Sequence, residues 1–337
     1  MKNENILLGH GSGGKMAAEL IQKVFLGKFG NPEAFPTDSA LLDIGVASLS
    51  FTTDSYVVDP VFFPGGNIGK LAVCGTINDI AVSGARPIAL SCGFIIEEGF
   101  PIAQLEEIVD TMAKEAALAG VPIVAGDTKV VPKGKCDKVF INTSGIGLLP
   151  AERKPIGSGT LCKPGDKIIV NGSVGDHGTA IMGSRNNISF DPPVMTDCAA
   201  LSQMIESVLL QSDGVHFMRD ATRGGLATVL CELAAGRDFG IEINEKNIPV
   251  NEQVEGFCEM FGFDPLYMAN EGKVVMVVAA DQYEKVLSIM KDHAFGLQCA
   301  VIGEISERYP SKVVMHTSVG GNRMMDMLAG EQLPRIC

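Results

Sequence analysis

Residues 88–125 read IALSCGFIIEEGFPIAQLEEIVDTMAKEAALAGVPIVA, and they predict a strand, a helix and a second strand. The two ends, Ile88–Ile96 and Val121–Ala125, are apolar runs of strand length. The middle has apolar residues at helical spacing, namely Ile102, Leu105, Val109, Met112 and Ala116. Pro101 suits the first turn of this helix, and Gly120 suits the position just past its end.

Further strands and helices are expected on either side of this stretch. In the first half, strand-like runs occupy Val46–Thr53 and Val139–Leu149, and helical spacing occupies Gly14–Phe29. The elements lack a regular strand–helix–strand alternation, which favours an α+β fold over a doubly wound parallel sheet. In the second half we expect strands at Lys167–Val174, Lys273–Ala280 and Cys299–Ile305 and helices at Cys198–Leu210, Leu226–Ala235 and Gln282–Lys291.

The length of the chain predicts two domains, because it has 337 residues and a domain takes about 150. Residues 150–166 concentrate Pro, Gly and charged residues and are the best candidate for the boundary. We therefore expect an N-terminal domain over residues 1–155 and a C-terminal domain over residues 156–328. Residues 329–337, AGEQLPRIC, have no periodicity and predict a mobile tail.

The charge balance is acidic, since 27 Lys and Arg stand against 40 Asp and Glu and give a formal net charge of −13. Such a surface repels phosphate backbones and anionic lipids, so neither nucleic acid nor a membrane is expected as a partner. No apolar run approaches the about 20 residues of a membrane span, and the N-terminus lacks the apolar core of a secretory signal. The nine cysteines include no CxxC pair and their number is odd, which predicts reduced thiols and a cytoplasmic protein.

A glycine-rich segment, GHGSGGK at residues 9–15, precedes the first expected helix. Bare backbone amides at a helix N-terminus bind anions, so this segment is a candidate phosphate site. The candidate ligands are His10, Gly11, Ser12, Gly13 and Gly14. Two phosphate-binding patterns nearly fit, but no strand with an acidic residue follows the helix, and Met16 stands where a phosphate loop has Ser or Thr. A flexible loop without a ligand is the alternative.

Acidic residues recur where strand-like segments are expected to end. They are Asp38, Asp54, Asp79 and Asp127. Each one alone could cap a turn. Gathered around a phosphate site they would bind Mg²⁺, which takes one or two carboxylates together with phosphate oxygens.

Three further residues are candidates for the chemistry. Glu271 precedes an apolar run, where desolvation would raise the pKa of its carboxyl toward that of a usable base; a solvated turn is the alternative. Lys129 could be its proton or charge partner. Cys337 is the last residue, and a mobile tail could carry its thiol into a cleft; an accidental terminal cysteine is the alternative.

Motifs along the whole chain resemble the HypE family of hydrogenase maturation proteins. They are GHGSGG at 9–14, FTTDSY at 51–56, FFPGGNIGKL at 62–71, GDTKVV at 126–131, GDHG at 175–178, RDATRGG at 219–225, NEGK at 270–273 and PRIC at 334–337. The resemblance runs from residue 9 to residue 337, and the terminal PRIC is very specific.

The resemblance implies an α+β fold with two domains of the aminoimidazole ribonucleotide synthetase (PurM)-like type. The N-terminal domains would pair in a homodimer, and ATP would bind at the cleft. It also implies a carbamoyl dehydratase. A carbamoyltransferase, HypF, would place a carboxamide on the thiol of Cys337, and ATP-dependent dehydration would convert it to a thiocyanate. The cyanide would pass to a HypC–HypD complex and become a ligand of the iron of [NiFe] hydrogenases.

The same resemblance assigns roles to the candidate residues. Cys337, Glu271 and Lys129 would be catalytic. ATP would be held by the glycine-rich loop, Lys70, Thr128 and the four aspartates, and the same aspartates would hold Mg²⁺.

Other functions are less consistent with the residues. A selenophosphate synthetase of the same superfamily would need a reactive Cys or selenocysteine near its glycine-rich loop, whereas the first cysteine here is Cys74. A thiamine-phosphate kinase or a purine-pathway ligase would have no use for a terminal cysteine. An ATP-regulated scaffold whose tail docks partners is a further alternative, and its ATP turnover would not depend on Cys337.

Overall fold

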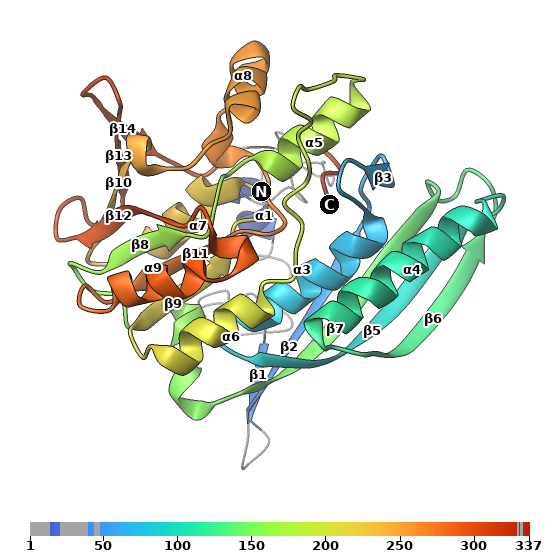
Figure 1. The fold of residues 1–337 in the computed structure, drawn as a ribbon, viewed down its shortest axis with the longest axis horizontal. Helices are drawn as coiled ribbons and strands as arrows, with labels where there is room; N and C mark the ends of the chain where they lie inside the picture. The colour runs from blue at the N-terminus through green and yellow to red at the C-terminus, as the bar shows by residue number, and fades with distance from the viewer. Residues whose placement is uncertain (1–13, 21–39, 44–47, 329, 331–332) are drawn as a thin grey trace.

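The computed structural model describes residues 14–20, 40–43, 48–328, 330 and 333–337 (Figure 1). Within these ranges the N-terminal half forms a five-stranded sheet in the order β1-β2-β7-β5-β6 and a small ribbon of β3 and β4. Its strands are β1 (Ala40–Asp43), β2 (Ser48–Tyr56), β3 (Phe62–Phe63), β4 (Gly66–Asn67), β5 (Arg86–Glu97), β6 (Ile123–Val131) and β7 (Val139–Leu149). Its helices are α1 (Gly14–Leu20), α3 (Ile68–Val82) and α4 (Ile102–Ala119).

The C-terminal half forms a seven-stranded sheet in the order β14-β13-β10-β12-β8-β11-β9, counted over the same described ranges. Its strands are β8 (Lys167–Val170), β9 (Val215–Asp220), β10 (Gly240–Asn244), β11 (Val274–Val278), β12 (Ala300–Ser306), β13 (Val313–His316) and β14 (Asn322–Met325). Its helices are α5 (Asp176–Arg185), α6 (Ser202–Gln211), α7 (Gly225–Ala234), α8 (Glu252–Phe261) and α9 (Tyr283–Lys291).

The prediction for residues 88–125 is confirmed, since they form β5, α4 and β6 in that order. Gly120 ends α4 with φ +69°, a conformation that favours glycine. β6 pairs parallel to β5, while the other pairs in this sheet are antiparallel. The expected α+β class is therefore confirmed. The two sheets lie on either side of residues 150–166, and the domain limits at 155 and 328 stay a prediction.

The central helix α3 was not predicted, because it is buried on almost every side and has no polar face for a periodicity to reveal. The side chain of Asn67 caps it by accepting from the N–H groups of Gly69 and Lys70. Gly69 lets α4 approach closely, since a Cβ there would lie 2.5 Å from Ile108 O. α3 contacts both β2 of the first sheet and β9 of the second, so it lies where the two halves meet.

No helix among the described residues combines the length and the apolar character that a membrane crossing requires.

Candidate active site

The last residues of the chain are seated against the body of the protein, near α5 and β3 (Figure 1). The N–H of Val57 donates to Cys337 O at 3.0 Å, and the N–H of Asp59 donates to Arg335 O at 3.3 Å. Ile336 is buried. Residues 333–337 of the tail that was expected to be mobile thus occupy a defined position, and the movement of the tail stays a prediction.

Charged groups from both halves surround the Cys337 thiol. Burial raises the pKa of this thiol to about 12, and the Arg223 guanidinium opposes that shift. Three carboxyl groups add to it, those of Glu271, Asp54 and Asp220. The influence is mutual, because Cys337 is the largest cause of a raised pKa at Arg223. The seated thiol is therefore protonated at neutral pH.

Glu271 is buried, as its place before an apolar strand predicted. Burial raises the pKa of its carboxyl well above 4.5, and Asp197 and Asp220 raise it further. The N–H of Glu271 donates to Asp197 Oδ1 at 3.0 Å, and Asn78 Nδ2 of α3 donates to Glu271 O at 3.4 Å. A carboxyl group with a raised pKa on a fixed backbone suits general-base catalysis.

A buried ion pair holds the loop that carries Glu271. Lys273 Nζ lies 2.9 Å from Asp197 Oδ2, and the two side chains are 9% and 5% exposed. Burial by itself would raise the pKa of Asp197, but the charge and hydrogen bond of Lys273 oppose it, and the pKa of Asp197 lies below its usual value. Asp197 also accepts from the N–H of Gly272 at 3.2 Å.

Replacing Lys273 by Met is expected to lower the free energy of unfolding by about 3 kcal/mol, because it leaves the Asp197 carboxylate buried without its cation. Urea unfolding measures the change. The matched control is Lys167→Met, whose partner Glu304 is 49% exposed, and it should cost less than about 1 kcal/mol. Equal losses in the two variants would contradict a structural role for the Asp197–Lys273 pair.

Two of the predicted metal ligands, Asp54 and Asp79, lie together. Thr76 Oγ1 donates to Asp54 Oδ2 at 3.1 Å, and Thr52 Oγ1 donates to Asp79 Oδ2 at 2.7 Å. Burial raises the pKa of Asp54, although hydrogen bonds from Thr76 and Asp79 oppose that shift. The two carboxyl groups lie within hydrogen-bonding reach of each other. Their oxygen donors fit Mg²⁺ bound together with phosphate.

The positions of these aspartates in the fold differ from the expectation. Asp54 lies inside β2, Asp79 inside α3 and Asp127 inside β6, so none of the three follows the end of a strand. The cause is that the predicted strands were too short and α3 was missed. In the described part of the chain, no group of three or more His, Cys, Asp or Glu side chains could hold a metal ion.

Asp127 and Lys129 lie away from the rest of the predicted site. They pair with each other at 3.0 Å, and each side chain is 70% exposed. Asp54 faces α3, whereas Lys129 stands beside Ile95 on the opposite face of the sheet. Within one chain, the structure therefore does not bring Lys129 to Glu271. Asp127 is likewise separated from the Asp54–Asp79 pair.

The remaining predicted ligands are placed only in part. Lys70 Nζ donates to Gly65 O at 3.2 Å, and its side chain lines a cavity of about 470 Å³ between the two halves. Thr128 is an exposed residue of β6. Gly14 begins α1 with φ +70°, and a Cβ there would meet Leu328 O at 2.5 Å. The other ligands of the predicted set lie outside the described residues, namely His10, Gly11, Ser12, Gly13 and Asp38.

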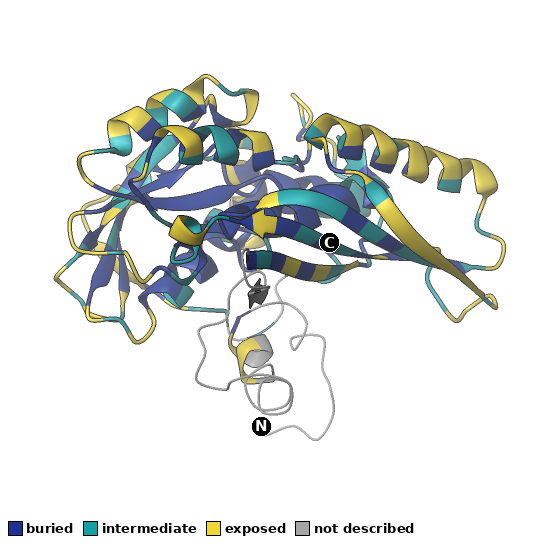
Figure 2. Ribbon diagram, turned by 90° about the horizontal axis from the view of Figure 1, so that it is seen from below, coloured by how far each residue is buried: buried dark blue, intermediate teal, exposed yellow. Residues whose placement is uncertain are grey.

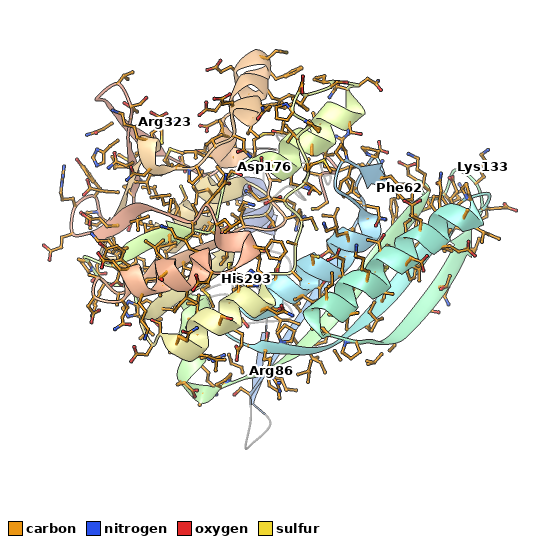
Figure 3. All side chains as sticks on the ribbon, in the orientation of Figure 1. Phe62, Arg86, Lys133, Asp176, His293 and Arg323 are labelled. Carbon is orange, nitrogen blue, oxygen red and sulfur yellow. The ribbon has the colours of Figure 1, made fainter. Side chains whose placement is uncertain are left out.

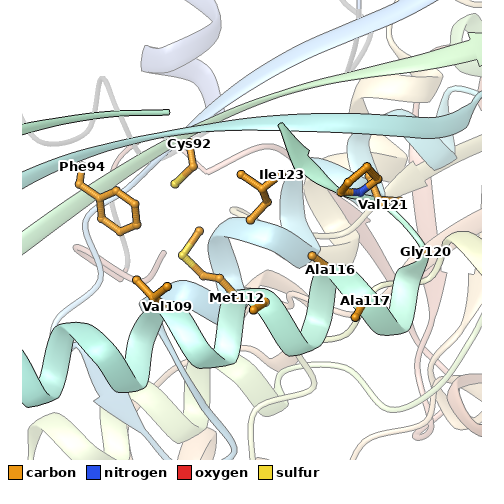
Figure 4. A pocket seen from close by; sticks show the side chains of 11 residues that line it. Cys92, Phe94, Val109, Met112, Ala116, Ala117, Gly120, Val121 and Ile123 are labelled. Carbon is orange, nitrogen blue, oxygen red and sulfur yellow. The ribbon is translucent and has the colours of Figure 1, made fainter. Parts of the chain in front are cut away.

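A second cavity, of about 570 Å³, lies between α4 and the strands β5 and β6 (Figure 4). Its wall is formed by apolar side chains such as Phe94, Met112 and Ile123. It offers no charged side chain for a nucleotide, so it is not a candidate for the reaction.

Sequence reasoning gave no role to several residues that the structure places at the site. Arg223 and His177 lie in two of the motifs that carry the family resemblance, RDATRGG and GDHG, but neither residue was given a role. Asp197 lies in no motif and is held opposite Lys273, which is 76 residues further along the chain. A contact across that separation leaves no local signal in one sequence.

Comparison with known proteins identifies relatives of the whole chain. Residues 36–149 match the family described as AIR synthase related protein, N-terminal domain, and residues 163–316 match its C-terminal domain. The carbamoyl dehydratase HypE of Rhodobacter capsulatus is 47% identical over 341 residues, which cover 100% of this chain and 99% of that protein.

Solved structures agree with this result. A HypE–HypF complex contains a chain that matches with a TM-score of 0.85 and 46% identity, over 92% of this chain and 99% of the other. A hydrogenase maturation protein HypE in complex with ATP matches with a TM-score of 0.82 and 45% identity, over 99% of this chain and 100% of the other.

Proposed function

The chain belongs to the HypE family of carbamoyl dehydratases, and on that premise we propose that it dehydrates a carboxamide carried by its own Cys337. The product would be a thiocyanate, the source of cyanide for the iron of a [NiFe] hydrogenase. One observation carries the proposal: the C-terminal thiol lies among charged groups of both halves, with the guanidinium of the exposed residue Arg223 and the buried Glu271 carboxyl beside it.

The overall reaction balances as follows. R–S–C(=O)–NH₂ and ATP give R–S–C≡N, ADP and inorganic phosphate. The C–O bond breaks, the oxygen leaves in the phosphate, and both N–H protons are lost. ATP with Mg²⁺ supplies the phosphoryl group that makes the carboxamide oxygen a leaving group.

The residues of this chain have separate tasks in that reaction. Glu271 accepts a proton from the amide nitrogen, since its raised pKa makes its carboxylate a stronger base than an exposed one. Arg223 stabilises negative charge that develops beside the sulfur. Asp54 and Asp79 would hold Mg²⁺ with phosphate oxygens completing its coordination. Lys70, Thr128 and the glycine-rich loop stay predicted ligands of ATP.

The pKa of the seated thiol supports a two-position tail. With a pKa of about 12, the seated Cys337 is not a nucleophile at neutral pH. Carbamoylation would therefore take place with the tail outside, on HypF, and the uncharged carboxamide would then enter the site. A relative has been solved as a HypE–HypF complex, which supports HypF as the donor. We propose HypC–HypD as the acceptor and the cytoplasm as the place of action.

An exposed apolar face supports the proposed homodimer. Phe51, Ile95 and Leu148 are 40%, 46% and 38% exposed on the side of the five-stranded sheet that faces away from α3. Figure 2 shows how exposed the sheet is along its edge strand β6. A second copy would cover these side chains. Lys129 lies on the same face, so in a homodimer it would serve the site of the partner.

Mixed dimers test this placement of Lys129. A Lys129→Ala chain paired with a Cys337→Ala chain is expected to recover dehydration, with one working site per mixed dimer, because each chain supplies what the other lacks. Activity is measured on purified mixed dimers carrying two different tags. The two single-variant homodimers are the controls and should be inactive. Mixed dimers as inactive as these controls would contradict catalysis across the interface.

The proposed function is tested by intact mass. The chain is incubated with HypF, carbamoyl phosphate and ATP, and the carbamoyl adduct is separated from HypF, which also uses ATP. Adding Mg-ATP to the isolated adduct should remove the mass of one water. An adduct that Mg-ATP leaves unchanged would exclude the dehydratase function and favour the scaffold.

A further inference from the structure

The seated tail is held mainly through its backbone carbonyl groups. Arg185, the last residue of α5, donates from Nη1 to Pro334 O at 2.7 Å and from Nη2 to Arg335 O at 2.9 Å. The same guanidinium donates from Nε and Nη2 to Asp59 O, at 3.0 and 2.5 Å. Arg185 therefore bridges the tail to the segment on which the tail lies.

His177, near the other end of α5, holds the next carbonyl of the tail. Figure 3 marks the start of this helix at Asp176. His177 Nε2 lies 2.8 Å from Ile336 O, and its Nδ1 lies 2.7 Å from Thr196 Oγ1. A carbonyl oxygen can only accept, so Nε2 carries the hydrogen and Nδ1 accepts from the threonine. Burial lowers the pKa of His177, which fits this neutral form.

Two side chains of the tail add to these contacts. The Arg335 guanidinium forms an ion pair with Asp137, donates from Nε to Val57 O at 2.9 Å and lies 6.0 Å from the centre of the Phe140 ring. Ile336 packs into the apolar core. Arg185 and His177 bind the carbonyl groups of residues 334–336, and the N–H of Val57 binds the carbonyl group of Cys337 itself.

We propose that Arg185 and His177 are positioning residues that set how Cys337 divides its time between the dehydration site and the solvent, where HypF reaches it. This proposal rests on the proposed function, because the dehydration reaction is what requires the tail to be bound in this position. Both residues hold the backbone of the tail, so they fix the thiol in place without touching it.

The consequence is that the two half-reactions respond in opposite directions. Weakening the contacts of Arg185 and His177 with the tail increases the fraction of chains whose Cys337 is exposed, so carbamoylation and alkylation become faster. It decreases the fraction whose carboxamide lies beside Glu271, so dehydration becomes slower. Each hydrogen bond lost to the tail should change this ratio about tenfold. A general loss of structure would instead slow both enzymatic steps.

The experiment compares Arg185→Gln with the wild-type chain. We expect alkylation of Cys337 by iodoacetamide at least about tenfold faster, read from the mass of the C-terminal peptide, and single-turnover dehydration slower by a similar factor. Carbamoylation by HypF should also be faster. The matched control is Arg153→Gln. Arg153 is a part-buried arginine whose Nη1 lies 2.7 Å from Glu206 Oε2, at a place away from the tail, so this variant should change none of the three rates.

A second pair of variants keeps the test independent of the arginine. His177→Gln retains an N–H donor for Ile336 O, whereas His177→Leu removes it. The Leu variant should show the same opposite changes as Arg185→Gln, and the Gln variant should lie between it and the wild type. Unchanged alkylation rates in both Arg185→Gln and His177→Leu would overturn the proposal.

The alkylation rate separates this inference from the proposed function, because it requires no reaction of the carboxamide. If alkylation is faster in the variants but Mg-ATP cannot dehydrate the wild-type adduct, the positioning role of Arg185 and His177 stands and the dehydratase function is excluded. Normal dehydration of the wild-type adduct with alkylation unaffected by the variants would exclude the positioning role alone.

Discussion

Cys337→Ala is expected to abolish thiocyanate formation completely, because it removes the sulfur atom that would carry the carboxamide in the proposed function. The measurement is the intact mass after incubation with HypF, carbamoyl phosphate and Mg-ATP, which should stay that of the unmodified chain. ATP hydrolysis that depends on the carboxamide should disappear with it. The variant should fold normally, since the Cys337 side chain is only half-buried at the end of the chain.

The control for this variant is Cys162→Ala. Cys162 is also half-buried, and burial raises the pKa of its thiol to about 12, as for Cys337. It differs in place, because it packs against the core of the C-terminal half. Its replacement should leave the adduct and its dehydration intact. A carbamoyl adduct on the Cys337→Ala chain would refute the assignment of the acceptor sulfur.

Glu271→Gln is expected to slow dehydration by about 10²- to 10⁴-fold, the range for loss of a general base. The amide has nearly the same size and keeps the backbone contacts with Asp197 and Asn78, so the fold should persist. Carbamoylation should stay normal, because in the proposed function it takes place on HypF, away from this site. Single-turnover dehydration of the isolated adduct, followed by mass, measures the effect.

The pH dependence gives this prediction a second readout. Burial raises the pKa of Glu271 well above 4.5, and a base acts only when it has lost its proton. Wild-type dehydration should therefore rise with pH until Glu271 ionises, with a midpoint above 4.5, and this rise should be missing in Glu271→Gln. Glu206→Gln, which alters a carboxylate paired with Arg153, is the control. Normal dehydration by Glu271→Gln would remove this residue from the mechanism.

Elements with a visible periodicity were predictable, and so was a short apolar run of strand length such as β11, whereas the buried helix α3 was not. The α4 helix has one polar face and ends at Gly120, so spacing and composition locate it. The α3 helix is apolar almost all round and gives no such contrast, although it carries Thr76, Asn78 and Asp79 to the site. Because α3 was not predicted, Asp79 was expected at the end of a strand instead of inside this helix.

For the site, the sequence by itself determined the types of residue and the family, through short motifs such as NEGK and PRIC in which chemistry needs particular side chains at fixed spacing. Only the tertiary structure decided which of them meet. It brings Cys337 to Glu271 and Arg223, seats the tail on α5, and places Lys129 on the far face of the sheet. These outcomes depend on contacts between residues far apart in the chain and on which face of a strand each side chain occupies, and neither leaves a local pattern in one sequence.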